Sequence, residues 1–445
     1  MHSSFLQTII SLVAGVAVII LLTVRFKLHP FFALLIACFV TGLGVNLTIE
    51  EILTLVKNGF GDILSKLTLI IVLGTSIGVL LEKNGSTRVM ANFILRIVGV
   101  HRSTLALSIT GFVVGLPIFC DSGYIVLNGI NNSLIKRTGY AVAQMSISLA
   151  SGLYAVHCLI PPHPGASAAA GTIGVDFGKL ILYGIVIAVP AMLVGHWWAI
   201  YAGKEKFKNG MREAEVLKQE EEDEQGPPVG LAFLPVFVPI LLMALKSFAG
   251  VGIKDKNFLS SLVTIIGDPA IALAIGVLLS IIIAKQKKNE LSKNLSSAVE
   301  KAGAILVIIG AGAAFGAVLA ATNIGLHFSE SLNLRSFGIW FPFLLTALIK
   351  TAQGSSTVAI VTASSIVLPL LPVLGLESEN AKILTVLSMG AGSMMVSHTN
   401  DAYFWVISKF SNIDIRTMLR VHSLASVWMG VTAILVIYVL SLFIL

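Results

Sequence analysis

About ten stretches of roughly 20 mainly apolar residues recur along this chain of 445 residues. One such stretch, folded as an α-helix, crosses the hydrocarbon core of a bilayer, which is about 30 Å thick. Hydrophobic residues make up 56% of the chain and charged residues only 12%, about half the charged share of a soluble domain. The sequence therefore predicts an all-α polytopic membrane protein with about ten transmembrane helices in the lipid bilayer.

Charge and cysteine content exclude several other classes of protein. The net charge is +7, but the basic residues are spread over short loops rather than gathered in one patch, so we expect no nucleic-acid partner. The three cysteines, Cys38, Cys120 and Cys158, form no C-x-x-C pair, which argues against a disulfide framework or a zinc site. We expect no metal and no cofactor.

The distribution of Lys and Arg predicts the orientation. If the N-terminus lies outside and each interrupted segment enters and leaves on one side, 21 of the 30 basic residues face the cytoplasm. The opposite orientation would reverse this bias, against the positive-inside rule. We expect both termini outside, and a multi-pass protein of the inner (cytoplasmic) membrane.

The chain divides into two halves with the same plan. An acidic, polar segment at 204–228 reads as a cytoplasmic linker between a first repeat at 1–203 and a second at 229–445. Each half has three spans, one segment broken by Gly, Pro and Ser (104–135 and 337–371), and two more spans. The broken segments predict two re-entrant hairpins. Five crossings per half is an odd number, so the sequence predicts inverted-topology repeats.

Broken helices at membrane depth point to a binding site. Helix ends leave backbone N–H and C=O groups unpaired, and in lipid each unpaired group costs several kcal/mol. Such ends persist where they line a cavity, and inverted repeats with broken helices are typical of transporters. We therefore expect the substrate site at the breaks.

The first hairpin contains Asp121 and Ser122, after Pro117. Asp121 is the only acid between Glu82 and Asp176. A carboxylate inside a membrane is expensive to keep charged, which suits a proton carrier. The alternative is that Asp121 only caps the second half-helix.

The second hairpin contains Gly354, Ser355, Ser356 and Thr357. Glycine with consecutive hydroxyls can form a group of donors at a helix N-terminus, which suits a substrate carboxylate. The alternative is an ordinary Ser/Thr cap. Lys350 just before this segment could pair with a carboxylate substrate or could extend to the membrane interface.

Two further clusters lie in matching spans of the two halves. In the first, three prolines between His157 and Gly165 prevent a regular helix, so His163 becomes a candidate substrate contact at the break. In the second, five consecutive polar residues, 397–401, include Asn400 as a candidate substrate contact and Asp401 as a second candidate proton carrier. Neither Asp121 nor Asp401 has an obvious basic partner in the sequence, which favours proton carriage.

Taken together, these motifs resemble the gluconate permease (GntP) family of sugar-acid:proton symporters over nearly the whole chain. The motifs are Gly115-Leu116-Pro117 with a nearby acid, Pro161-Pro162-His163-Pro164-Gly165, Ala352-Gln353-Gly354-Ser355, and Ser397-His398-Thr399-Asn400-Asp401 followed by Ala402-Tyr403-Phe404-Trp405. The resemblance implies a transport domain carrying both hairpins, a scaffold domain and a homodimer. It also implies uptake of gluconate or a related hydroxy acid with protons. The chain departs from the family pattern at Cys120-Asp121-Ser122 and at Ala402-Tyr403.

The sequence thus predicts a secondary transporter that imports a small organic anion, a sugar acid, with protons by an elevator-type motion. We expect the substrate carboxylate between the hairpin tips, and its hydroxyls near Asn400 and His163. Sodium coupling is an alternative, since Thr399, Asn400 and exposed carbonyls could form an oxygen cage. An intramembrane hydrolase using His157, His163 and Asp121 is a second alternative, although H-E-x-x-H and G-x-S-x-G are absent. A channel fits two inverted halves less well.

Overall fold

The computed structural model describes residues 4–204, 226–252, 258–284, 287–322 and 334–445. Over these residues the regular secondary structure is helical and includes no strand, as predicted. Residues 205–225, which form most of the expected linker, lie outside the described residues.

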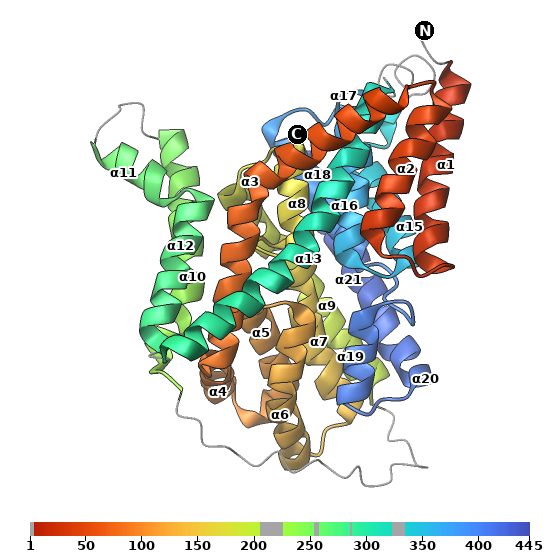
Figure 1. Cartoon of the computed structure of the whole chain (residues 1–445). Coiled ribbons are helices and arrows are strands. Elements are labelled where there is room, and N and C mark those ends of the chain that lie inside the picture. The colour runs from red at the N-terminus through yellow and green to blue at the C-terminus, as the bar shows by residue number, and fades with distance from the viewer. Residues whose placement is uncertain (1–3, 205–225, 253–257, 285–286, 323–333) are drawn as a thin grey trace.

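The helices fall into two groups, before and after the expected linker (Figure 1). Those of residues 1–203 are α1 (Phe5–Val24), α2 (Pro30–Gly44), α3 (Ile49–Lys83), α4 (Ser86–Val98), α5 (Ser103–Gly115), α6 (Cys120–Thr138), α7 (Val142–Leu159), α8 (Pro164–Ile173) and α9 (Phe177–Ala202). Those of residues 229–445 are α10 (Val229–Gly252), α11 (Phe258–Ile266), α12 (Pro269–Ala284), α13 (Lys288–Ala321), α15 (Trp340–Gln353), α16 (Ser356–Val367), α17 (Leu371–Leu374), α18 (Glu379–Met394), α19 (Ala402–Phe410), α20 (Ile415–Met418) and α21 (Leu424–Ile444).

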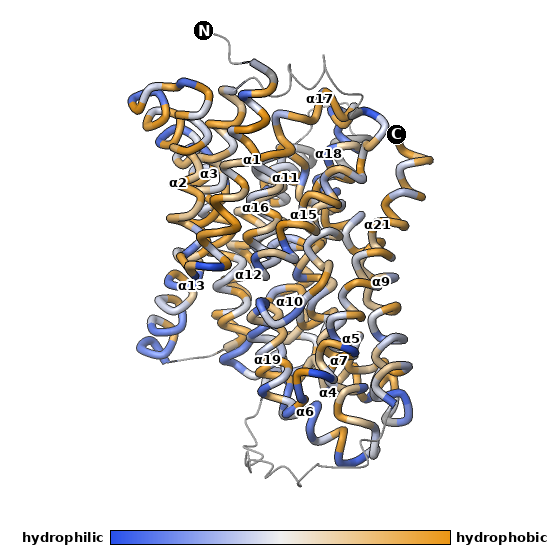
Figure 2. The backbone as a smooth tube through the Cα atoms, turned by 90° about the vertical axis from the view of Figure 1, so that its right-hand side faces the viewer, coloured by the Kyte–Doolittle hydropathy of each residue, from blue (hydrophilic) through white to orange (hydrophobic). Residues whose placement is uncertain are grey.

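Eight helices of the described residues are long and apolar enough to cross a membrane. The predicted count of about ten transmembrane helices therefore differs from what length and composition support. Three of the expected spans, α2 with 15 residues and α12 and α18 with 16 each, fall below that length, and one of the eight, at 356–374, lies in an expected broken segment. A helix of 15 residues rises only about 22 Å, less than the hydrocarbon core of about 30 Å. Figure 2 shows hydrophobic residues along most of the molecule's height, with hydrophilic segments mostly towards its two ends.

The two longest helices, α3 with 35 residues and α13 with 34, pack along each other and run obliquely across the molecule (Figure 1). Both begin well before the apolar spans expected at 64–81 and 303–321. The start of α3 is set by a capping box. Thr48 Oγ1 accepts from Glu51 N at 3.2 Å, and Glu51 Oε2 accepts from Thr48 N at 2.7 Å. The α1–α2 pair lies on one side of these long helices, and α10–α12 lies on the other.

Small residues let each long helix touch the broken segments of its own half. A Cβ on Gly78 of α3 would lie 2.4 Å from Pro117 O, at the link between α5 and α6. A Cβ on Gly312 of α13 would lie 2.2 Å from Val361 Cγ1 of α16. These contacts require glycine, because real Cβ atoms do not come this close to other heavy atoms. The G-x-x-x-G pattern in each long helix therefore sets its distance from the hairpin of the same half.

The start of α1 and the end of α21 lie at one end of the molecule (Figure 1). The end of α9 and the start of α10, which flank the expected linker, lie towards the opposite end.

Candidate functional site

Four breaks in the helices meet around one cavity of about 490 Å³. Two are the short links at the tips of helix pairs, 116–119 between α5 and α6 and 354–355 between α15 and α16. The other two are the interruptions 160–163 between α7 and α8 and 395–401 between α18 and α19. The last turns and first turns of these helices supply most of the lining.

Twelve of the eighteen lining residues have polar side chains, and α13 adds one further wall. The lining residues are Phe119, Cys120, Asp121, Ser122, Tyr154, His157, Pro164, Lys301, Ala304, Ile305, Gln353, Ser355, Ser356, Thr357, Asn400, Asp401, Ala402 and Tyr403. Seven of the nine expected site residues are among them: Asp121, Ser122, Ser355, Ser356, Thr357, Asn400 and Asp401. Gly354 and His163 are not in the lining.

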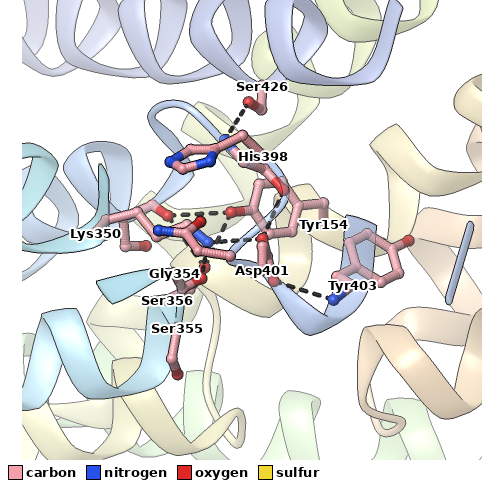
Figure 3. Close-up of polar contacts among 12 residues, drawn as sticks. Tyr154, Lys350, Gly354, Ser355, Ser356, His398, Asp401, Tyr403 and Ser426 are labelled. Carbon is pink, nitrogen blue, oxygen red and sulfur yellow. Dashed lines mark hydrogen bonds and ion pairs between the residues drawn. The ribbon is translucent and has the colours of Figure 1, made fainter. Parts of the chain in front are cut away.

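Lys350 and Asp401 form a buried ion pair beside the cavity (Figure 3). The Lys350 side chain is 0% exposed, and its Nζ donates to Asp401 Oδ2 at 2.6 Å and to Gly354 O. The sequence-based expectation that Asp401 lacks a basic partner is therefore wrong. Of the two alternatives for Lys350, extension to the membrane interface is wrong, because the last turn of α15 points its side chain inward.

The same carboxylate accepts two further hydrogen bonds. Ser397 Oγ donates to Asp401 Oδ2 at 2.5 Å, and the Tyr403 N–H donates to Asp401 Oδ1 at 3.0 Å, so Asp401 caps α19 (Figure 3). Ser397 Oγ also lies 3.0 Å from His422 Nε2, in the π-helical turn before α21. Asp401 is thus the centre of a network that joins α15, α19 and the start of α21.

The loop 395–401 caps the C-terminal end of α15. Asn400 Nδ2 donates to Thr351 O at 2.9 Å and to Ala352 O at 3.2 Å, and His398 Nε2 lies 3.0 Å from Thr351 O. Gly354, which follows α15, has φ of +92°, and a Cβ there would lie 2.2 Å from Asn400 O. Gly354 thus has a backbone role, because it lets the hairpin tip contact this loop directly.

His163 has an equivalent position at the first hairpin. Its Nε2 lies 2.8 Å from Gly115 O, the last residue of α5, and its side chain is 2% exposed. His163 and His398 therefore occupy the same place in their halves, each capping the first helix of a hairpin from the adjacent break. His157, in contrast, lies within α7 and lines the cavity, with its ring 5.0 Å from that of His163.

Asp121 is the carboxylate of the cavity that has no cation partner within 4.0 Å among the described residues. It lies in the first turn of α6 and is partly buried. Its side chain accepts a weak hydrogen bond from the Cys120 thiol, whose Sγ is 3.9 Å from Asp121 Oδ1. The N-terminus of α6 has no side-chain cap, so Asp121 does not have the alternative role of capping this helix.

Nearly the whole chain matches one known protein family. The profile of the GntP family permeases matches residues 7–443. The chain belongs to the GntP permease family. It is 33% identical over 442 residues to the gluconate permease of Pseudomonas aeruginosa, a match that covers 97% of each chain. It is 27% identical over 448 residues to the D-serine transporter of Escherichia coli, covering 99% of each.

The fold of this GntP permease is also similar to that of a solved membrane protein. The structure of MtrF from Neisseria gonorrhoeae matches with a TM-score of 0.62 at 17% identity, covering 87% of this chain and 83% of that one. Since its relatives are permeases and transporters, the protein is a multi-pass membrane transporter and not an enzyme. This excludes the intramembrane hydrolase.

Several cavity residues of this permease were missed by sequence reasoning. Tyr154 is 1% exposed, and its hydroxyl lies 2.9 Å from Ser356 Oγ and donates to Ser393 O at 3.1 Å. In the sequence, the only sign of this role is a polar hydroxyl within an apolar span. Gln353 lies in a motif that was noted for its glycine and serines. Lys301, two residues before the span expected at 303–321, is an exposed residue of α13 at the cavity wall.

Unpaired polar atoms remain in the lining. The Gln353 side-chain amide and Asn400 Oδ1 are buried and have no hydrogen-bond partner among the described residues. Buried amides normally find a partner, so these groups can serve a ligand. Within the described part of the chain, no group of three or more His, Cys, Asp or Glu side chains is placed to hold a metal ion.

Proposed function

We propose that this permease imports a small sugar acid, gluconate or a related hydroxy acid, together with protons across the cytoplasmic (inner) membrane. The observation that carries the proposal is Asp121, a carboxylate on the cavity wall without a paired cation among the described residues. Two like charges 4 Å apart repel by about 4 kcal/mol at an effective dielectric constant of 20. An anionic substrate therefore binds beside Asp121 far more readily when Asp121 is protonated, which couples the two ligands.

The other lining groups suit a polyhydroxy acid. Ser355, Ser356 and Thr357 begin α16, where backbone N–H groups and hydroxyls can receive the substrate carboxylate. The unpaired side-chain amide of Gln353 and the unpaired Oδ1 of Asn400 can form hydrogen bonds with substrate hydroxyls, since a hydroxyl both donates and accepts. The gluconate permease of Pseudomonas aeruginosa supports this substrate class.

We propose that the two hairpins and the two broken helices move together as a transport domain, in an elevator-type motion. The scaffold would include α1–α3 and α10–α13, and the cavity has walls from both groups because Lys301, Ala304 and Ile305 belong to α13. The very long helices α3 and α13, each placed before the hairpin of its half, support the proposal that 1–203 and 229–445 are inverted repeats joined by the linker 204–228. We also propose a homodimer, on the resemblance to the family.

Purified protein in proteoliposomes tests the coupling. With an inward proton gradient and no sodium, radiolabelled gluconate should accumulate above its external concentration. A panel containing other sugar acids, simple monocarboxylates and D-serine would then rank substrates by competition. If accumulation requires a sodium gradient and does not respond to the proton gradient, sodium and not the proton is the coupling ion. Strong competition by D-serine with none by sugar acids would overturn the substrate class.

A further inference from the structure

Lys350 is a fully buried cation that the proposed coupling does not use. We infer that Lys350 is an internal counter-charge for Asp401, which leaves Asp121 as the one proton-exchanging carboxylate of the cavity and makes import of a monovalent anion electroneutral. This inference rests on the proposed proton symport and adds its stoichiometry, one proton for each substrate anion.

The contacts around Asp401 favour its ionised form. Its Oδ2 faces two donors, Lys350 Nζ at 2.6 Å and Ser397 Oγ at 2.5 Å, and its Oδ1 faces the Tyr403 N–H at 3.0 Å. A proton added to the carboxylate would displace one of these donors and leave the Lys350 ammonium buried without a counter-ion. Such an uncompensated buried charge is strongly unfavourable. Lys350 is therefore a positioning residue that acts through Asp401, and the pair contributes no net charge.

Asp121 has different surroundings. The titratable groups that share the cavity with it are the thiol of Cys120, the phenols of Tyr154 and Tyr403, the imidazole of His157, the Lys350–Asp401 pair and the Lys301 ammonium. The thiol and phenols are neutral at physiological pH in their ordinary state. Lys301 belongs to α13, in the group of helices that we assign to the scaffold, so its charge does not travel with the substrate.

The moving part then carries the same charge whether empty or loaded. When empty it has the negative charge of Asp121 and a neutral Lys350–Asp401 pair. When loaded, Asp121 holds one proton and is neutral, and the substrate carboxylate supplies the negative charge. One turnover therefore transfers one proton and one monoanion, and the sum of their charges is zero.

Wild-type proteoliposomes provide the first test. Uptake of radiolabelled gluconate is first driven by a proton gradient at zero potential, then measured with an inside-negative potassium diffusion potential at equal pH on both sides. We expect the potential to change the accumulation ratio by less than about twofold, whereas entry of one net positive charge would raise it about tenfold for each 59 mV. The tenfold response would overturn the inference and leave proton symport standing. No uptake with the proton gradient would overturn both.

Variants test the role of Lys350 itself. In Lys350→Met, Asp401 loses its counter-charge and becomes a second carboxylate that binds a proton with the substrate outside and releases it inside. Two protons then enter with each monoanion, a net charge of +1 for each turnover, so the uptake that remains should respond to the inside-negative potential. The double variant Lys350→Met/Asp401→Asn removes both charges, so its remaining uptake should again ignore the potential. The matched control is Lys179→Met, which breaks a partly exposed pair with Glu379 of similar length, 2.7 Å, and should not change the potential response.

If Lys350→Met does not fold, the double variant alone tests the inference. We expect it to fold better than Lys350→Met, because no buried charge is left unpaired, and its uptake should not respond to the potential. A potential-driven double variant would overturn the inference. His157→Gln addresses the remaining titratable group. If His157→Gln loses part of its proton-driven uptake and the ratio of protons to gluconate changes, His157 also carries a proton, and the inference is overturned.

Discussion

Lys350 Nζ lies 2.6 Å from Asp401 Oδ2, although the two residues are 51 positions apart in the chain. The contact joins the last turn of α15 to the N-terminal cap of α19, and thus a hairpin to the broken helix beside it. Because Lys350 also donates to Gly354 O, the pair fixes the hairpin tip as well. The pair thus adds an ionic contact to the hydrogen bonds of Asn400 and His398 that hold the end of α15.

The first prediction concerns the stability of this pair. Lys350→Met and Asp401→Asn should each lower the free energy of unfolding by about 3–5 kcal/mol, because each leaves one buried charge uncompensated. The double variant should be less destabilised than the sum of the two single variants. Thermal unfolding in detergent, followed by intrinsic fluorescence, gives the four melting temperatures. Additive losses would show that the two charges do not stabilise each other.

The second prediction separates the two candidate proton carriers. Asp121→Asn keeps the shape of the side chain but cannot release a proton, so proton-driven accumulation should be lost while counterflow exchange of substrate is retained. Its melting temperature should stay close to that of the wild type, because Asp121 has no ion-pair partner within 4.0 Å in the described part of the chain. Wild-type accumulation and pH dependence in Asp121→Asn would remove this residue from the mechanism.

The third prediction concerns the hairpin tip. Gly354 has φ of +92° and lies against the backbone of Asn400, so Gly354→Ala should be destabilising by at least about 1–3 kcal/mol and should impair transport. Gly303→Ala is the matched control, because a Cβ at this position in α13 meets nothing within 4 Å. The control should be neutral or slightly stabilising, since alanine favours a helix over glycine by about 1 kcal/mol. Equal behaviour of the two variants would contradict a steric requirement at Gly354.

The fourth prediction concerns orientation. Single cysteines at Ser4 and Gln219, the latter outside the described residues, should react differently with a membrane-impermeant thiol reagent in whole cells. Position 4 should be labelled, and position 219 should be labelled only after the membrane is permeabilised. The native Cys38 and Cys158 are buried, and Cys120, which lines the cavity, is replaced by serine in both variants to keep the background low. Labelling of position 219 alone in intact cells would reverse the topology.

The sequence alone determined much of this architecture. Long apolar runs without charges have few stable alternatives to membrane helices, so the helical class and the family follow from them. Gly and Pro within such runs marked three of the four breaks, because these residues disfavour a continuous helix. The break at 395–401 contains neither residue, and only its run of polar side chains marked it. Polar side chains within apolar spans predicted seven of the cavity residues, because a polar group buried in an apolar span is unfavourable unless it has a partner or a ligand. These are Asp121, Ser122, Ser355, Ser356, Thr357, Asn400 and Asp401.

Only the tertiary structure decided how these groups are used. The sequence could not show that Lys350 turns inward to Asp401, that His163 caps Gly115 rather than lining the cavity, or that Lys301 of α13 forms part of its wall. Each of these depends on the rotation and register of helices that are distant in the chain. A side chain's partner is set by which faces of two helices meet, and local sequence periodicity does not specify that meeting. The distinction between a paired and an unpaired carboxylate, on which the proposed coupling rests, is therefore a property of the packing.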